Sequence, residues 1–475
     1  MLTYSLEDRG SVPIYDYLYQ CIRDDILSGK IKKDEKLPSK REFAKHNKVS
    51  VITIENAYSQ LLTEGFIYSL PKRGYYASDI LKNTEYLDKN QNVKVAHEQE
   101  FVTKYVDHEY FVDLKSNSAS LDNFPFSVWS KLMREVLSVH DTSLLKIVPF
   151  NGIAELRMAL SDYLYRFRGI AVSPDQIIIG AGTEYLYSRL IQLLGSEDRL
   201  HFAVEDPGYK KISEIYKSNG LDYSYIPVDD NGMKIDELEK SNANIAHISA
   251  SHLYPLGQIM PIKRRQELLR WAAKKEDRYI IEDDYDCEFR INGKPVPPIK
   301  SYDTCNKVIY INTFSKTLSP SIRISYMVLP EKLMEKYINT MSFYACTVSS
   351  FEQYTLKRFI SEGYFERHIS RMRNYYKNLH SDIIKAVKKS EFINRAIICE
   401  GNAGTHILLK LDTDKTDKEL IEAAAGYDVN ITFVSEYCSD TLLGCGNYNH
   451  ILIVNYSAIV PERMEYAFNV IAKIL

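Results

Sequence analysis

The sequence predicts an α/β protein with two parts: a small N-terminal domain of three helices and a hairpin, and a large body built on a mostly parallel sheet. In the first 78 residues, three short amphipathic segments precede an alternating stretch that turns once. Residues 79–110 are rich in Lys, Asn, Asp and Glu with little periodicity, which is typical of a flexible linker. Beyond residue 110, short apolar runs alternate with helical segments, as in a sheet covered by helices on both faces.

The composition is that of an ordinary globular protein, with 475 residues, 45% hydrophobic side chains and a net charge of −3. No apolar run approaches the ~18 residues of a membrane span, and the opening "MLTYSLEDRG" is acidic and polar, unlike a signal peptide. Seven cysteines are scattered without a C-x-x-C pair, which indicates reduced thiols and no zinc site. We therefore expect a cytoplasmic protein without a membrane span or a bound metal.

The N-terminal domain, residues 1–78, is predicted to be a winged helix-turn-helix. Apolar residues recur every four positions from 14 to 26, which predicts a first helix. A second short helix begins after Ser39, its expected N-cap, and a third runs through "VSVITIENAYSQLLTEGF" with one apolar face. The alternating stretch "FIYSLPKRGYYAS" then turns at residues 71–74, as a two-stranded wing would.

The charge pattern of this domain favours binding to DNA. Residues 30–48 hold eight Lys or Arg against three acidic residues, although the whole chain is slightly acidic. Such a cluster contacts phosphates and gives affinity without sequence choice. On the exposed face of the third helix, Thr53 offers a methyl group to thymine and Asn56 can pair with adenine. The alternative is a solvated helix face in an interaction module.

At this point the domain resembles the GntR-type DNA-binding domain, through "DEKLPSKR", "VSVITIENAYSQLLTEGF" and "PKRGYY". The resemblance covers most of residues 10–78 and implies double-stranded DNA as a partner. It departs at Val51, where that family often has arginine, so the family's base preference does not carry over. The implied DNA contacts are Lys40, Arg41, Ser50, Thr53, Lys72 and Arg73, to which the third helix adds Asn56.

In the body, four loops at the predicted carboxyl ends of strands carry unusual residues, and such loops converge on one crevice. "GAGT", residues 180–183, opens a helix and presents backbone N–H groups to an anion. "VEDPGY" ends in Tyr209, and "RYIIEDDYD" places Asp283 and Tyr285 just after a strand. "NTFSKTLSPSIR" supplies an amine and a guanidinium seven residues apart, from Lys316 and Arg323.

Together these groups match the needs of pyridoxal 5′-phosphate (PLP). PLP requires a lysine for its Schiff base, a carboxylate for its ring nitrogen and a cradle for its phosphate. Each element alone has an ordinary explanation, since a strand-terminal Asp is usually a cap, a lone Lys a surface charge and "GAGT" a turn. Four such loops in the expected order predict a PLP site.

From about residue 111 to the end, the chain resembles the fold-type I PLP-dependent aminotransferases, with "NGIAELR" and "GNAGTHILL" as further landmarks. Head and body together resemble the MocR/GabR-type transcription regulators of the GntR family. This implies a large domain with a mostly parallel sheet and a smaller C-terminal α/β subdomain over about residues 345–475. It also implies that 111–475 bind PLP and form a homodimer.

The resemblance gives each site residue a role. Lys316 is the Schiff-base lysine, and Asp283 is the partner of the ring nitrogen. Tyr285 bonds the phenolic oxygen, and Tyr209 covers the ring. The phosphate is held by Gly182, Thr183, Thr313, Ser315 and Arg323.

Three departures from the aminotransferase pattern bear on activity. Tyr254, in Tyr-Pro-Leu-Gly, replaces the asparagine that tunes the phenolic oxygen, and we count it among the cofactor-binding residues. Ile147 stands where the partner subunit's tyrosine normally contacts the phosphate, and Ile453 replaces the arginine that grips the substrate carboxylate. We therefore expect a body that binds the cofactor with little or no sustained turnover, so that it is not an enzyme.

The leading hypothesis is a PLP-dependent transcriptional regulator that senses a small molecule. One alternative is a PLP-dependent aminotransferase with an appended DNA-binding head, and another is a dimerisation platform without cofactor. A homodimer with two heads implies an operator with two half-sites. The sequence leaves the effector open between PLP itself and an amino acid or amine; His252 and Lys211 flank the expected pocket, although each also has a structural or solvated explanation.

Overall fold

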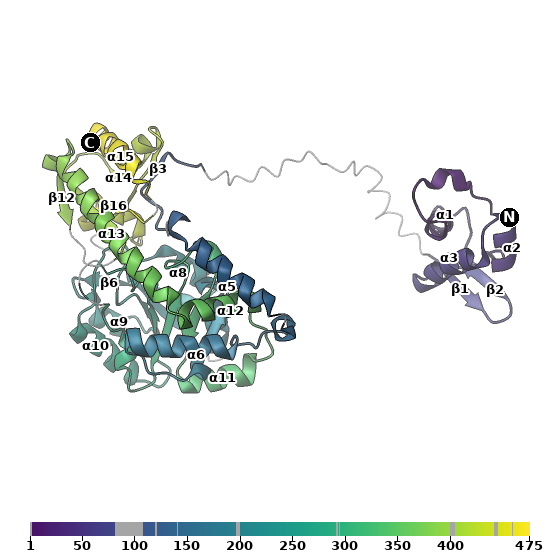
Figure 1. Cartoon of the computed structure of the whole chain (residues 1–475), viewed down its shortest axis with the longest axis horizontal. Helices are drawn as coiled ribbons and strands as arrows, with labels where there is room; N and C mark the ends of the chain where they lie inside the picture. Colours follow the sequence, from purple (N-terminus) through teal and green to yellow (C-terminus); the bar gives the residue numbers. More distant parts are fainter. Residues whose placement is uncertain are drawn as a thin grey trace. The chain divides into compact units, whose positions relative to one another are not determined.

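The computed structural model describes residues 2–80, 108–118, 121–139, 141–195, 200–290, 293, 295–399, 404–440, 445–457 and 459–475. The chain divides into two compact units, Met1–Asp107 and His108–Leu475 (Figure 1). Within the linker predicted at 79–110, residues 81–107 lie outside the described residues. Each unit is described by itself.

The first unit is a winged helix-turn-helix, as predicted. Its helices share one apolar core, in which Ile54 and Tyr58 of the third helix pack with Leu18 and Phe43. Ser39 caps the second helix through a reciprocal capping box with Glu42, which confirms the predicted N-cap. The elements are α1 (Ile14–Leu27), α2 (Lys40–His46), α3 (Val51–Thr63) and the antiparallel strands β1 (Ile67–Leu70) and β2 (Gly74–Ala77).

The second unit is built on an eight-stranded sheet in the order β4-β11-β10-β9-β8-β5-β6-β7. The pairs β10–β9, β9–β8, β8–β5 and β5–β6 are parallel, whereas β11 runs antiparallel to both of its neighbours. This confirms the predicted mostly parallel sheet. The strands are β4 (Ile177–Gly180), β5 (His201–Asp206), β6 (Asp222–Asp229), β7 (Gly232–Met233), β8 (Ile245–Ile248), β9 (Tyr279–Asp283), β10 (Val308–Thr313) and β11 (Ser325–Val328).

Helices cover both faces of this sheet because its central strands are apolar on both sides. In β4, Ile177 and Ile179 belong to one core with α6 and α12, whereas Ile178 belongs to a second core with α7 and α11. A third core packs α9 and α10 against β8 and β9. The helices are α5 (Phe126–Ser138), α6 (Ala154–Tyr163), α7 (Thr183–Leu194), α8 (Lys210–Ser218), α9 (Ile235–Lys240), α10 (Ile262–Ala273), α11 (Glu331–Met341) and α12 (Ser350–Ser361).

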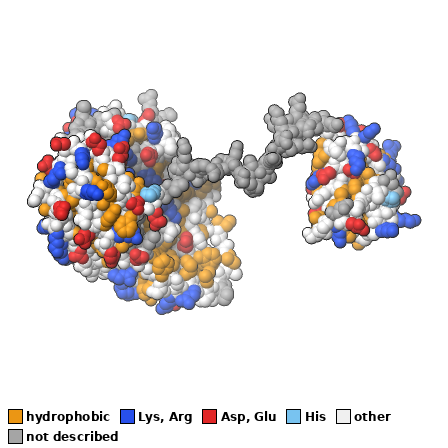
Figure 2. All heavy atoms as spheres, turned by 90° about the horizontal axis from the view of Figure 1, so that it is seen from above, with side chains coloured by type: hydrophobic (Ala, Val, Ile, Leu, Met, Phe, Trp, Pro, Cys, Tyr) orange, Lys and Arg blue, Asp and Glu red, His pale blue; other side chains and the backbone are white. Residues whose placement is uncertain are grey.

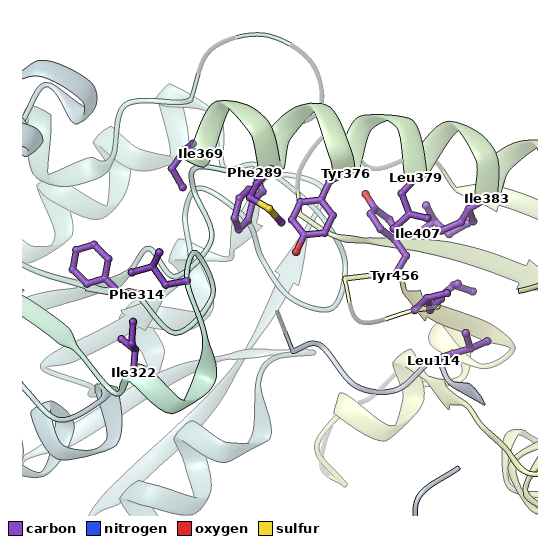
Figure 3. Packing of buried hydrophobic residues seen from close by; sticks show 14 of the residues in the cluster. Leu114, Phe289, Phe314, Ile322, Ile369, Tyr376, Leu379, Ile383, Ile407 and Tyr456 are labelled. Carbon is purple, nitrogen blue, oxygen red and sulfur yellow. The ribbon is translucent and has the colours of Figure 1, made fainter. Parts of the chain in front are cut away.

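The C-terminal part forms a smaller α/β layer, as the resemblance implied. An antiparallel sheet in the order β12-β13-β16-β15 packs with the long helix α13 (Tyr364–Lys389). Figure 3 shows Tyr376, Leu379 and Ile383 of α13 pointing toward Ile407 and Tyr456. The remaining elements are β12 (Ala396–Cys399), β13 (His406–Leu411), α14 (Asp417–Ala425), β14 (Val429–Asn430), β15 (Thr432–Phe433), β16 (Ile451–Asn455) and α15 (Met464–Ile474).

The start of the second unit also joins this smaller layer. Strand β3 (Val112–Asp113) pairs in parallel with β14, and Asn455 of β16 donates its backbone N–H to the carbonyl of Leu114 at 3.0 Å. The chain after β3 is thereby fixed beside the small sheet. The subdomain boundary near residue 345 stays a prediction.

Candidate functional site

A cavity of about 510 Å³ lies where the carboxyl ends of β5, β8, β9 and β10 meet. This is the edge at which open α/β sheets bind ligands. Except for Gly182, all the predicted cofactor residues line it: Lys316, Asp283, Tyr285, Tyr209, Tyr254, Thr183, Thr313, Ser315 and Arg323. Residues that were predicted from separate loops of the chain therefore surround one space.

Lys316 follows β10 and carries its amine into the cavity. Its Nζ donates a hydrogen bond to the carbonyl of Asn117 and lies 5.9 Å from the centre of the Tyr285 ring. Burial lowers the pKa of Lys316 to about 8, although the carboxylates of Asp286 and Asp283 favour its charged form. Lys316 is therefore a better nucleophile near neutral pH than an exposed lysine.

This pKa predicts how the ligand-free protein reacts with PLP. Only the neutral amine condenses with an aldehyde, so the attachment rate should rise about tenfold per pH unit below pH 8 and level off above it. Stopped-flow absorbance from about pH 6 to about pH 10 measures the rate, and Nα-acetyl-lysine in the same buffers corrects for titration of PLP itself. A corrected rate that keeps rising to about pH 10 would contradict a lowered pKa of Lys316.

Asp283 ends β9 and is positioned by a tyrosine that sequence reasoning missed. Its Oδ2 accepts a hydrogen bond from the Tyr187 hydroxyl at 2.5 Å, while its buried Oδ1 has no hydrogen-bond partner among the described residues. Burial raises the pKa of Asp283 to about 7. An N–H donor such as the protonated ring nitrogen of PLP would satisfy Oδ1 and stabilise the ionised carboxylate. The residues therefore fit this end of the cofactor.

The residues of the predicted anion cradle come together at the start of α7. Gly182 has a φ of 92°, and a Cβ at this position would lie 2.2 Å from Nη2 of Arg323, so glycine lets the guanidinium approach the helix N-terminus. Thr313 Oγ1 accepts hydrogen bonds from Ser325 Oγ at 2.8 Å and from the Ser315 N–H at 3.1 Å. Hydroxyls, a guanidinium and helix N–H groups suit a phosphate dianion.

The carboxylate of Glu184 lies beside the positively charged side chains at the start of α7. Glu184, in the first turn of α7, accepts hydrogen bonds from both Arg323 and Lys211. Despite burial, which acts in the opposite direction, these two cations lower the pKa of Glu184. The predicted flanking residue Lys211 thus lines the cavity as part of an ion-pair network.

The predicted tyrosines occupy different walls of the cavity. The Tyr285 hydroxyl lies 3.0 Å from Nδ1 of His252. The hydroxyl of Tyr254 lies 3.2 Å from that of Tyr437 and accepts from Asn455 Nδ2 at 3.3 Å. The ring of Tyr209, which is 52% exposed, lies 6.5 Å from the ring of Tyr254.

His252, by contrast, is a buried structural group rather than a cavity residue. Its Nδ1 lies 2.7 Å from Oδ2 of Asp286, and the histidine side chain is almost fully enclosed. This matches the structural explanation that the sequence left open for it.

Two further buried side chains of the cavity wall, Glu205 and His247, were not predicted from the sequence. Glu205 of β5 accepts from the Ser249 N–H at 2.9 Å, and its Oε1 has no partner in the described parts of the chain. Burial raises the pKa of Glu205 to about 8 and lowers that of His247 to about 3. Both lie inside apolar strands, where the sequence pattern indicates only core residues. The one available signal was the pair of acidic residues at the end of "AVED", which includes Glu205.

Two of the three departures from the aminotransferase pattern have clear structural settings. Ile147 is 85% exposed. Ile453 is fully buried in a small apolar cluster with Leu408 and Val434, against which Tyr437 packs. The position that would carry an arginine is therefore apolar and closed.

In the winged helix-turn-helix, some of the predicted DNA-contacting side chains already bond to other residues of the domain. Ser50 caps α3, because its Oγ accepts a hydrogen bond from the Thr53 N–H at 3.1 Å. The Nζ of Lys40 donates to Oε1 of Glu55 in α3 at 2.6 Å. Lys and Arg side chains are spread over the face of this unit that Figure 2 shows. The remaining predicted contacts are all exposed: Arg41, Asn56, Lys72 and Arg73.

Two family models match the chain. The model described as bacterial regulatory proteins, gntR family, matches residues 14–76, and that of aminotransferase class I and II matches residues 109–441. These ranges fall on the winged helix-turn-helix and on the body that carries the cavity.

Several regulators are similar along most of the chain. The uncharacterized HTH-type transcriptional regulator YdeL of Bacillus subtilis is 38% identical over 424 residues, 89% of each chain. The probable rhizopine catabolism regulatory protein MocR of Rhizobium meliloti is 28% identical over 480 residues, 98% of this chain and 94% of MocR. The pyridoxine biosynthesis regulator PdxR of Corynebacterium glutamicum is 26% identical over 446 residues, 93% and 92% of the two chains.

Solved aminotransferases share the fold of the body. The multiple substrate aminotransferase of Thermococcus profundus aligns with a TM-score of 0.67 at 23% identity, over 82% of this chain and 98% of its own. The kynurenine aminotransferase of Pyrococcus horikoshii aligns with a TM-score of 0.66 at 22% identity, over 86% and 96%. Among the described residues, no helix is long and apolar enough to cross a membrane, and no acidic, His or Cys cluster could hold a metal ion.

Proposed function

Because this chain belongs to the MocR-type family of HTH-type transcriptional regulators, which join a GntR head to an aminotransferase class I and II body, we propose that the body senses a small molecule through PLP held at Lys316. The observation that carries this proposal is the cavity itself. It combines a lysine whose pKa is lowered, a buried carboxylate with a free oxygen and a cationic cradle at a helix N-terminus. No simpler role explains all three together.

Each wall of the cavity has a task in this proposal. When bound, PLP supplies an aldehyde that condenses with primary amines and a ring that withdraws electrons. Lys316 would hold the aldehyde carbon, and Asp283, positioned by Tyr187, would keep the ring nitrogen protonated. Arg323 and the N-terminus of α7 would bind the phosphate.

A homodimer is part of this proposal. Large apolar side chains stand exposed around the connection between α5 and α6, where Val139 is 69%, Leu145 77% and Ile147 85% exposed. Figure 2 shows apolar side chains gathered in patches on the visible face of the body. Exposed apolar groups in this number mark interaction surfaces. Two heads on one dimer would then read two half-sites of an operator.

The proposal also includes little or no sustained transamination, in contrast to an aminotransferase with an appended head. A transaminase must hold the substrate carboxylate, and losing a bidentate arginine contact costs on the order of 1.5–3 kcal/mol of binding. Poor orientation can reduce the rate a further ~100-fold. The closed apolar setting of Ile453 supports this loss.

We therefore expect the PLP-loaded protein to release keto acid far more slowly than about 1 per second with any common pair of amino acid and keto acid. A coupled keto-acid assay measures this, with an active aminotransferase of the same class as positive control. The retained pair of Asp283 and Lys316 is what favours the enzyme alternative. Sustained turnover at about 1 per second or faster would establish that alternative.

A further inference from the structure

A short segment, residues 115–118, forms one side of the cavity and is fixed beside the reactive lysine. Asn455 Nδ2 donates a hydrogen bond to the carbonyl of Lys115 at 3.0 Å, and the Lys115 N–H donates to Asp113 at 2.9 Å. Two residues later, the carbonyl of Asn117 accepts from Lys316 Nζ. Leu114, which precedes the segment, is anchored in the core drawn in Figure 3.

An amino acid bound with its amine near Lys316 needs a cation for its carboxylate. At position 453, where aminotransferases have an arginine, this chain has an isoleucine buried in an apolar cluster. The five cationic side chains that line the cavity are Lys115, Lys210, Lys211, Lys316 and Arg323.

Two of these cationic side chains already form ion pairs with a carboxylate. Arg323 and Lys211 both pair with Glu184 at the N-terminus of α7, which is the phosphate end of the site. Lys316 itself is the attachment point. Lys115 and Lys210 remain, the latter as the first residue of α8.

Lys115 has the better position of the two. It stands two residues from Asn117, so its Cα lies at most about 7 Å along the chain from the residue that contacts the reactive amine. Its Nζ is held only loosely, 3.7 Å from Glu436, and its side chain is 47% exposed. Such an exposed ion pair is weak, so a ligand carboxylate can replace Glu436.

Two hydroxyls reinforce this end of the cavity. Tyr254 and Tyr437 both line it, with their oxygens 3.2 Å apart. Because Tyr254 accepts from Asn455 Nδ2, its own O–H is free to donate to Tyr437 or to a carboxylate. An ammonium and two phenol hydroxyls are donors that suit a carboxylate.

We propose that Lys115 anchors the carboxylate of the effector, and that the effector is therefore an amino acid rather than a simple amine. This rests on the proposed function, since it requires PLP at Lys316. The anchor comes from the N-terminal segment of the body, in place of the arginine that is absent from β16.

The test uses the full chain loaded with PLP. The common amino acids are titrated in parallel with the primary amines that remain when their α-carboxyl groups are removed, and the change in PLP absorbance gives each affinity. The wild-type protein should bind at least one amino acid about tenfold or more tightly than its matched amine. Lys115→Met should abolish that preference, while PLP attachment and amine affinity stay unchanged.

Two variants control for a general loss of charge. Lys210→Met removes another cavity lysine and should keep the preference for the amino acid. Glu436→Gln releases Lys115 and should raise amino-acid affinity a few-fold, a gain that damage to the fold would not produce.

Three results would overturn the inference: an unchanged preference in Lys115→Met, a preference lost only in Lys210→Met, or no amino acid that binds better than its amine. In each of these cases PLP absorbance remains, so the proposed cofactor role survives. Failure of the wild-type protein to attach PLP at all would instead refute both proposals.

Discussion

Lys316→Ala protein is expected to lose all PLP on dialysis, whereas the wild-type protein keeps it with its visible absorbance. The amine of Lys316 lies 5.9 Å from the centre of the Tyr285 ring, and the carboxylate of Asp283 favours its charged form, so we expect Lys316 to form the covalent bond. The remaining contacts, from the phosphate cradle and Asp283, hold PLP only reversibly. Absorbance spectra before and after dialysis, with mass spectrometry after borohydride reduction, measure the attachment.

Lys210→Ala is the matched control, because Lys210 also lines the cavity and should leave the attachment intact. Far-ultraviolet circular dichroism of both variants checks that the fold is kept. A reduced PLP adduct on a lysine other than 316 would show that the site has been assigned to the wrong residue.

The second large effect concerns DNA. The isolated head, residues 1–78, should bind the operator about 10²–10⁴-fold more weakly than the full chain at matched salt, because two linked heads gain effective concentration. The head has its own apolar core, so it is expected to fold alone. Fluorescence anisotropy on operator duplexes selected from random sequence measures both affinities.

Arg41→Ala in the full chain gives an internal check, since this exposed residue is predicted to contact a phosphate. Its loss should weaken binding to all DNA sequences. It should also reduce the slope of log affinity against log salt concentration by about one unit. Equal affinities of the isolated head and the full chain would refute the model of two linked heads.

Much of the fold could be predicted because its signals are local. Helical periodicity, the capping residue Ser39 and the wing turn specify the head from short stretches. The strand-end residues Asp283 and Lys316 could be grouped because the carboxyl ends of parallel strands share one edge of a sheet. Rules of this kind depend only on order along the chain.

Other parts of the site depend on contacts between distant segments. Tyr187 lies on the apolar face of α7, where a tyrosine looks like core, and only the folded sheet places its hydroxyl at Asp283. Lys115 reaches the cavity because β3 pairs with β14, more than 300 residues later in the chain. The partner of Lys40 is also unpredictable from the sequence, since Glu55 approaches it only after α2 and α3 pack together.

Coupling between the two units requires that an effector bind one arrangement of the protein better than another. The most direct measurement follows operator binding and keto-acid release in the same sample of PLP-loaded full chain, with and without an amino acid that alters the PLP absorbance. The account predicts that operator affinity changes by about fivefold or more without sustained release of keto acid, and that Lys316→Ala protein shows no change. Unchanged operator affinity with turnover of about 1 per second or faster would contradict it.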